Sequence, residues 1–594
     1  MRPNSTLWQI TYRPADSIFI AACLLLVSMI APSISADLLY ANITGYRYVE
    51  GEPPENTPLQ HRALAPREGY WTSFNAMRIN DEGRIVKTYS IEDQKPSAST
   101  ELTVVDGQGR TVLPGLIDAH GHILGLGQTY QRVDLMGTES VQAAQQLVAT
   151  FAEMQPEQEW ILGRGWNQVL WPDKQFPTAS DLDEIEAKKP VFLRRIDGHA
   201  GWANSAALKK AGITALTRDP SGGQILRDAD GVPTGVLVDK AMDMVERNIP
   251  PPSMASVVEA LGFAQKELAQ MGITSAHDAG VNAELAKLYR KMAANDQLSV
   301  RVYGMVSGAG PELTEVGAPW PADERDMFLL RSVKLYADGA LGSRGAAMIE
   351  PYSDQKDSRG LLFSPFDELE LQVRRAADLG FQVNVHAIGD AANRQVLDIF
   401  ARLPLRRHKL RHRIEHAQII AMDDLVKFQK HEVIASMQPT HATSDMNMAE
   451  DRIGSERVKG AYAWRKILDL GVVIAAGSDF PVELSNPFHG LYSAVSRKDH
   501  KGNPDGGWYP EENLTRGEAL KAFTVDAAFS AHQETKIGNL EQGKWADFIV
   551  LEEDFFKLPE ADIWKMQVHE TWVGGKRVYT AVDEQKAADK KAAK

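Results

Sequence analysis

The stretch Leu113–Gly127, LPGLIDAHGHILGLG, decides the fold of this sequence. It is an apolar run that places two histidines, His120 and His122, at alternate positions. Side chains alternate between the two faces of a β-strand, so both imidazoles share one face and Gly121 lies on the other. Imidazole nitrogens are common ligands of zinc. The pattern therefore predicts a buried strand that ends in a two-pronged metal clamp.

Further apolar runs alternate with helical patterns over residues 115–534, which predicts parallel β/α units. The later strand candidates are VFLRRID (191–197), ITSAHDAG (273–280), RVYGMVSG (301–308), SVKLYADG (332–339), FQVNVHAIGD (381–390), HRIEHAQ (412–418), VIASMQP (433–439) and VVIAAGSDFP (472–481). Together with the first strand they number one more than an eight-stranded (β/α)8 barrel of the TIM type needs. We expect VFLRRID to belong to a segment inserted after the first strand, at about 150–250.

The sequence pattern at both ends of the chain differs from that of the middle. Residues 37–114 and 535–580 are rich in β-branched runs separated by glycine turns, which predicts hairpins. We expect the two ends to form one composite β-sandwich beside the barrel. Residues 581–594 are polar and predict a solvated tail.

The first 36 residues resemble a targeting segment. Arg2 and Arg13 precede the apolar run IFIAACLLLVSMI, and APSISA supplies small residues for cleavage. This layout predicts a secretory signal peptide over residues 1–36 and a periplasmic or secreted protein. The competing interpretation is an uncleaved anchor, although the run is shorter than the ~20 residues of a spanning helix. After cleavage we expect no membrane association.

Composition narrows the class of protein. The formal net charge is −14, whereas nucleic-acid binders are usually basic, so the sequence disfavours a nucleic-acid partner. Cys23 is the only cysteine and lies in the expected signal segment. The mature chain would therefore contain neither a disulfide nor a cysteine nucleophile.

Several strand candidates end in a residue that can bind a metal. Each such residue alone has an ordinary structural interpretation, such as a hydrogen-bonded histidine or a turn aspartate. In a β/α barrel, however, the carboxyl ends of the strands meet at one mouth. Imidazole and carboxylate ligands together favour zinc, or another divalent metal. The candidate metal residues are His120, His122, Lys334, His386, His416 and Asp479.

Long blocks of the chain resemble the amidohydrolase superfamily, and more narrowly amidohydrolase family 3, the branch that contains N-substituted formamide deformylase-like proteins. The blocks include LPGLIDAHGH, RRIDGHAGWANSAAL, KLYADGALGSRGA, NVHAIGDAAN, RIEHAQ and AAGSDFPVE. The resemblance implies ligands on strand 1 (His-x-His), strand 4 (lysine), strands 5 and 6 (histidines) and strand 8 (aspartate). Counting back from Asp479 leaves VFLRRID outside the eight.

The resemblance also implies a chemistry. In binuclear relatives the lysine is carboxylated, which would make Lys334 an anionic bridge between two zinc ions. The alternative is a single-metal site in which Lys334 stays an amine, because an ammonium has no lone pair to offer a metal. A metal-bound hydroxide would attack the substrate carbonyl, and Asp479 would act as general base and acid toward the leaving nitrogen.

Four further residues are candidates for substrate binding. His199 and Trp202 belong to the RRIDGHAGWANS block, which predicts a pocket wall, although Asp197 could equally hold His199 in a structural loop. His277 ends the second strand, and Arg344 follows Lys334 closely, where a structural ion pair is the alternative.

We therefore expect a metal-dependent hydrolase that cleaves non-peptide amide-type C–N bonds of a small-molecule substrate. Alternatives on the same site are a cyclic amidase, a deaminase, an esterase, or a non-catalytic metal-bearing binding protein. The resemblance is compatible with a homodimer.

Overall fold

The structure is a computed structural model that describes residues 37–63, 68–195, 200–220, 223–404, 407, 409–583 and 585. The expected signal segment 1–36 and residues 586–594 of the expected tail lie outside this range. Among the described residues, no helix has both the length and the apolar character needed to cross a bilayer.

Eight parallel strands form the central sheet. Each strand pairs with its neighbours in this series, and the two end strands, β7 and β20, each pair with one neighbour. The series matches the expected order, so the prediction of a TIM-like (β/α)8 barrel is confirmed. Its strands are β7 (Leu116–Gly121), β14 (Ile273–Val281), β15 (Arg301–Ser307), β16 (Phe328–Tyr336), β17 (Gln382–Ala387), β18 (Arg413–His416), β19 (Ile434–Met437) and β20 (Ile474–Ala476).

The first and last strands meet and nearly close the barrel. Gly121 pairs with Phe480 in a parallel bridge. The backbone N–H of Asp479 donates to the carbonyl of His120 at 2.7 Å, and that of His122 donates to the carbonyl of Phe480 at 2.8 Å. A Cβ on Gly121 would lie 2.3 Å from the Phe480 ring. The glycine between the two histidines is therefore required by the closeness of the seam.

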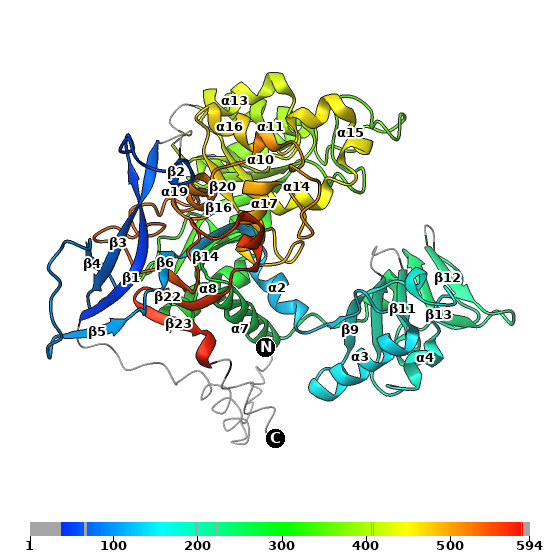
Figure 1. The fold of residues 1–594 in the computed structure, drawn as a ribbon. Coiled ribbons are helices and arrows are strands. Elements are labelled where there is room, and N and C mark those ends of the chain that lie inside the picture. Colours follow the sequence, from blue (N-terminus) through cyan, green and yellow to red (C-terminus); the bar gives the residue numbers. More distant parts are fainter. Residues whose placement is uncertain are drawn as a thin grey trace, which may run out of the picture.

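A helix follows each barrel strand, and these helices surround the barrel (Figure 1). In α10, for example, Leu369, Val373, Ala376 and Ala377 recur at helical spacing and are buried. The helices are α2 (Ile123–Thr129), α7 (Met254–Gln270), α8 (Ala283–Ala294), α9 (Pro311–Val316), α10 (Phe366–Asp378), α11 (Asp390–Ala401), α13 (Leu425–Lys430), α14 (Pro439–Asp445), α15 (Ala449–Arg457), α16 (Trp464–Asp469), α17 (Pro487–Ser496), α18 (Arg516–Ala522) and α19 (Val525–Ser530).

The two chain ends share a nine-stranded sheet, at the left of Figure 1. A buried ion pair ties it to the barrel, because Arg301 of β15 holds Asp547 through contacts of 2.6 and 2.9 Å. Whether this sheet packs as a two-layered sandwich stays a prediction. Its strands are β1 (Asp37–Glu50), β2 (Arg62–Ala63), β3 (Gly69–Ile79), β4 (Ile85–Tyr89), β5 (Leu102–Asp106), β6 (Thr111–Pro114), β21 (Phe548–Leu551), β22 (Val568–Val573) and β23 (Lys576–Thr580).

A separate six-stranded sheet is inserted between α2 and α7 and stands to one side of the barrel (Figure 1). It contains the VFLRRID strand, and it begins at Val133, earlier than the expected residue 150. Its strands are β8 (Val133–Asp134), β9 (Ile161–Trp166), β10 (Val191–Arg195), β11 (Ala200–Ala203), β12 (Gly223–Arg227) and β13 (Pro233–Asp239), with helices α3 (Val141–Met154), α4 (Ala179–Asp183), α5 (Ser205–Lys210) and α6 (Asp243–Glu246).

Candidate metal centre

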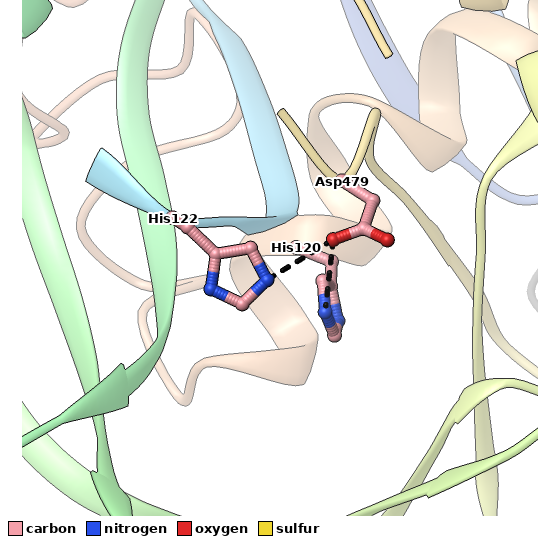
Figure 2. Close-up of side chains that lie close together, drawn as sticks. All are labelled: His120, His122 and Asp479. Carbon is pink, nitrogen blue, oxygen red and sulfur yellow. Dashed lines mark ion pairs between the residues drawn. The ribbon is translucent and has the colours of Figure 1, made fainter. Parts of the chain in front are cut away.

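Three ligand-type side chains meet at the seam between β7 and β20 (Figure 2). His120 is the last residue but one of β7, which ends at Gly121, His122 is the residue before α2, and Asp479 follows β20. Oδ1 of Asp479 lies 3.6 Å from Nε2 of His120 and 3.2 Å from Nε2 of His122. One ligand atom from each residue lies within 4.8 Å of the other two, which is close enough to share one metal ion.

The remaining strand-end candidates lie against this trio. Nζ of Lys334 is 3.0 Å from Nε2 of His120. The ring of His416 lies 4.9 Å from that of His120 and 4.5 Å from that of His386, measured between centroids. The structure thus brings all six sequence-predicted metal residues to one mouth of the barrel.

The backbone at two of these residues is in the left-handed region. His416 has φ +74° and Asp479 has φ +63°. For residues other than glycine this conformation costs roughly 1–2 kcal/mol. At His416 it has a visible result, because Glu415 and His416 are consecutive and yet both contact His120. A regular strand would point them to opposite faces.

Glu415 is a site residue that the sequence analysis missed. It is fully buried, and its Oε2 lies 2.5 Å from Nδ1 of His120. Its Oε1 lies 2.9 Å from the guanidinium of Arg413, two residues earlier on β18. Since the carboxylate occupies Nδ1, Nε2 of His120 is left to face the mouth. The pattern Arg-x-Glu-His holds the sequence signal for this residue. Strand alternation, however, predicts only the face of the strand on which Glu415 lies, and it does not predict the contact with His120.

Asp118 is a second residue whose part in the site only the structure reveals. Its carboxylate accepts hydrogen bonds from the hydroxyl of Ser478 at 2.7 Å and from the backbone N–H groups of Ser478 and His120. Burial raises the pKa of Asp118 to about 7. The side chain thereby clamps the turn that leads into Asp479 against β7.

Burial and the charge of Lys334 favour the neutral form of His120 and His386. Burial, with help from the Lys334 charge, lowers the pKa of His120 to about 4 and that of His386 to about 3. Burial also lowers the pKa of Lys334 to about 8. Neutral imidazole is the form that binds a metal.

The two acids carry the opposite shift. Burial alone would raise the pKa of Glu415, but Arg413 and His120 bring it well below its ordinary value. Burial opposes ionisation of Asp479 in the same way, but the neighbouring imidazole of His122, whose Nε2 lies 3.2 Å from Oδ1, lowers its pKa strongly. Both side chains are therefore carboxylates at neutral pH.

These residues fit a divalent metal. Oδ1 of Asp479 and Nε2 of His386 are buried without a hydrogen-bond partner, although buried polar atoms are normally satisfied. Nδ1 of His416 lies 2.8 Å from Oε1 of Gln438, which orients that ring from behind. Unsatisfied nitrogen and oxygen atoms directed into one mouth form a zinc-type donor set.

The three substrate-binding candidates that the structure describes, Trp202, Arg344 and His277, do not gather at this mouth. Trp202 is fully buried in the inserted sheet, where its ring packs on Trp166 and Trp171 at 6.2 and 6.3 Å, and its part in substrate binding stays a prediction. Arg344 forms an ion pair with Asp354 at 2.8 Å, as the structural alternative proposed. His199 lies outside the described residues.

His277 is fully buried inside the barrel, and its contact with a substrate stays a prediction. Its Nδ1 lies 3.0 Å from the guanidinium of Arg413. Because Arg413 in turn holds Glu415, His277 belongs to the support beneath the site.

The fold and the site together define a metal-dependent hydrolase built on a (β/α)8 barrel. Residues 103–579 match the family described as "Amidohydrolase family". This chain therefore belongs to the amidohydrolase family, and it is a hydrolase of carbon–nitrogen bonds.

Known proteins similar to the chain agree with this assignment. It is 33% identical to "Putative amidohydrolase YtcJ" of Bacillus subtilis, over 84% of this chain and 95% of that protein. It is 28% identical to "N-substituted formamide deformylase" of Arthrobacter pascens, over 83% and 93% respectively. Among solved structures it resembles an uncharacterized metal-dependent hydrolase of Pyrococcus horikoshii, with a TM-score of 0.72 and 26% identity over 88% of this chain and 99% of that one.

The contact between Glu415 and His120 predicts a role in metal binding. Replacing such an outer partner of a metal-binding histidine typically weakens metal affinity about 10- to 100-fold. We expect Glu415→Gln to raise the dissociation constant for zinc within this range, as measured by competition with a chromogenic chelator. Glu534→Gln, which alters an acid paired with Arg411 just before β18, is the matched control. Equal affinity in wild type and Glu415→Gln would contradict the assignment.

Proposed function

We propose that the chain binds one or two zinc ions and hydrolyses a non-peptide amide bond of a small molecule. His120, His122 and Asp479 would hold the first ion. His386 and His416 would hold the second, with Lys334 between the two positions. The observation that carries this proposal is the seam, where Oδ1 of Asp479 lies 3.6 and 3.2 Å from the two His-x-His imidazoles.

The surroundings of Lys334 support a carboxylated lysine. Its side chain is 1% exposed and its Nζ lies 3.0 Å from Nε2 of His120. An ammonium cannot donate a lone pair to a metal. A neutral amine can add to carbon dioxide with loss of one proton, which yields an anionic carbamate with oxygen ligands. The pKa of about 8 makes the neutral amine accessible near physiological pH.

A metal bound at this site supplies a Lewis acid that polarises the substrate carbonyl and eases deprotonation of water. The chain then has to move one proton. Asp479 accepts it as water attacks the carbonyl carbon, and returns it to the amide nitrogen as the C–N bond breaks. The products are a carboxylic acid and an amine. The lowered pKa of Asp479 means that it enters the reaction as a carboxylate, while the contact with Glu415 holds His120 in place.

We expect Asp479→Asn to abolish hydrolysis while metal remains bound. The amide oxygen can still contact a metal, but it cannot carry the proton, and loss of such a group typically costs about 10²–10⁴-fold in kcat. The assay is a panel of N-substituted formamides, acetamides and cyclic amides, with matched esters, on zinc-loaded protein. Asp354→Asn, in the ion pair with Arg344, is the control. Full activity in Asp479→Asn would contradict this role, and tight binding without turnover would favour a binding protein.

Lys334→Ala should change the metal content. We expect wild-type protein, prepared without chelator and with bicarbonate, to hold two zinc ions per chain and the variant to hold at most one, because the bridge is lost. Elemental analysis of both proteins provides the measurement. One ion in each would move Lys334 from metal bridging to substrate binding.

We also propose export to the periplasm or beyond, followed by removal of residues 1–36. The protein purified from the exporting cell should then begin at Asp37 when its N-terminus is sequenced. Retention of Met1 in the membrane fraction would favour the anchor instead. A homodimer is a further proposal, which the mass measured in solution tests.

A further inference from the structure

His441 is a further histidine at the site, and it follows a strand that supplies none of the six predicted metal residues. It lies on α14, which begins directly after β19, the seventh barrel strand. Its side chain is 13% exposed, and its Nε2 is buried without a hydrogen-bond partner. The ring lies nearly parallel to that of His416, at 18° and 5.9 Å between centroids. An imidazole with an unsatisfied buried nitrogen at the mouth needs a partner that comes from outside the chain.

The position of His441 separates it from the metal residues. Oδ1 of Asp479 faces His120 and His122, whereas Oδ2 faces Nε2 of His441 at 3.9 Å. Among the described residues, the group of ligand atoms close enough to share an ion comprises His120, His122 and Asp479 and does not include His441. His441 therefore approaches the carboxylate from the side away from the first proposed ion.

The separation of 3.9 Å is too long for a direct hydrogen bond and suits a shared third atom. One polar atom about 2.9 Å from both Nε2 and Oδ2 would subtend an angle of about 85° between them, which ordinary hydrogen-bond geometry allows. A nitrogen of a bound substrate can occupy such a position. It would then lie beside Nε2 of His441, which can accept a hydrogen bond, and beside the carboxylate of Asp479, which carries the proton.

The helix that carries His441 is held firmly from behind. Asp445, one turn later on α14, accepts hydrogen bonds from the hydroxyl of Tyr462 at 2.6 Å and from Nε2 of Gln418 at 3.0 Å. Pro439 occupies the first turn. The helix that carries His441 is thus held by buried contacts, and the His441 ring lies against that of His416, as a group that orients a substrate requires.

We propose that His441 contacts the scissile amide, its Nε2 accepting a hydrogen bond from the amide N–H beside Asp479. The inference rests on the proposed function and narrows the substrate to amides that carry an N–H. A neutral imidazole offers one acceptor nitrogen, and an ester has no N–H to meet it. His441 is therefore a residue that selects amides over esters, while Asp479 returns the proton to the same nitrogen.

The test compares an amide and an ester that share both the acyl and the alkyl group, beginning with N-butylformamide and butyl formate and continuing through the panel described above. We expect His441→Ala to lower kcat/KM for the amide about tenfold, the value of one lost hydrogen bond, and to leave the ester within about threefold. His441→Gln, whose amide oxygen can reach the place of Nε2, should restore part of the loss. Zinc content should equal that of wild type in both variants.

Thr443→Val is the matched control, since that hydroxyl on the same helix contacts Thr440 and Ser493 and not Asp479. Equal loss on amide and ester would assign His441 a structural role, loss of zinc would make it a ligand, and unchanged amide kinetics would remove it from the site. Each of these results overturns the inference while the proposed function stands. A wild-type enzyme that hydrolyses none of the amides overturns both.

Discussion

The site depends on the closure of the barrel between its first and last strands. His120 and Asp479 are 359 positions apart in the chain, and a backbone hydrogen bond of 2.7 Å brings them together. The approach is possible because both strands carry glycine at the contact. A Cβ on Gly477 would meet the backbone nitrogen of His120 and the carboxylate of Asp118 at 2.6 Å, much as one on Gly121 would meet Phe480. Any larger residue would open the seam and separate the two halves of the proposed metal site.

Closing the seam forces several charges into a space that excludes water, and the fold balances them in pairs. Arg413 and Lys334 contribute positive charge, and Glu415 and Asp479 contribute negative charge, all of them largely buried. His120 lies at the centre, in contact with Glu415 and Lys334 and close to Asp479. Removing one member of such a group leaves its partner buried and uncompensated, which costs far more than the pair contributes. The charged residues beneath the site are thus as strictly required as the proposed metal ligands above them.

The sequence predicts the barrel because its strands follow from simple periodicity, and it places the six candidate metal residues at strand ends. That Lys334 joins the histidines and Asp479 as a ligand is implied by the resemblance to the amidohydrolase superfamily. Alternation pairs His120 with His122, and parallel strands send their ends to one mouth. Contacts across the barrel have no such signature. Glu415 and His441 look like ordinary polar residues until β18 and α14 are placed against β7 and β20.

The position of Trp202 differs from the prediction for a related reason. The RRIDGHAGWANS block predicts a pocket wall, but Trp202 lies in the core of the inserted sheet, with its indole N–H donating to the carbonyl of Thr178. Composition cannot separate a tryptophan that fills a core from one that lines a pocket, since both need an apolar surface and a hydrogen-bond acceptor. The deciding fact is that β11 belongs to the six-stranded sheet and not to the barrel. Sequence order alone does not reveal which sheet a short strand will join.

The geometry of Asp479 explains why the seventh strand takes part in a site whose proposed metal ligands come from other strands. The left-handed backbone at Asp479 sets the carboxylate between two groups of side chains, with Oδ1 toward the His-x-His pair and Oδ2 toward His441. A carboxylate that only held a metal could direct both oxygens to it. One that also carries a proton needs its second oxygen on the substrate side, next to a group that fixes the receiving nitrogen. In this fold the neighbour of strand 8 on that side is strand 7, so a residue just beyond β19 is well placed to provide it.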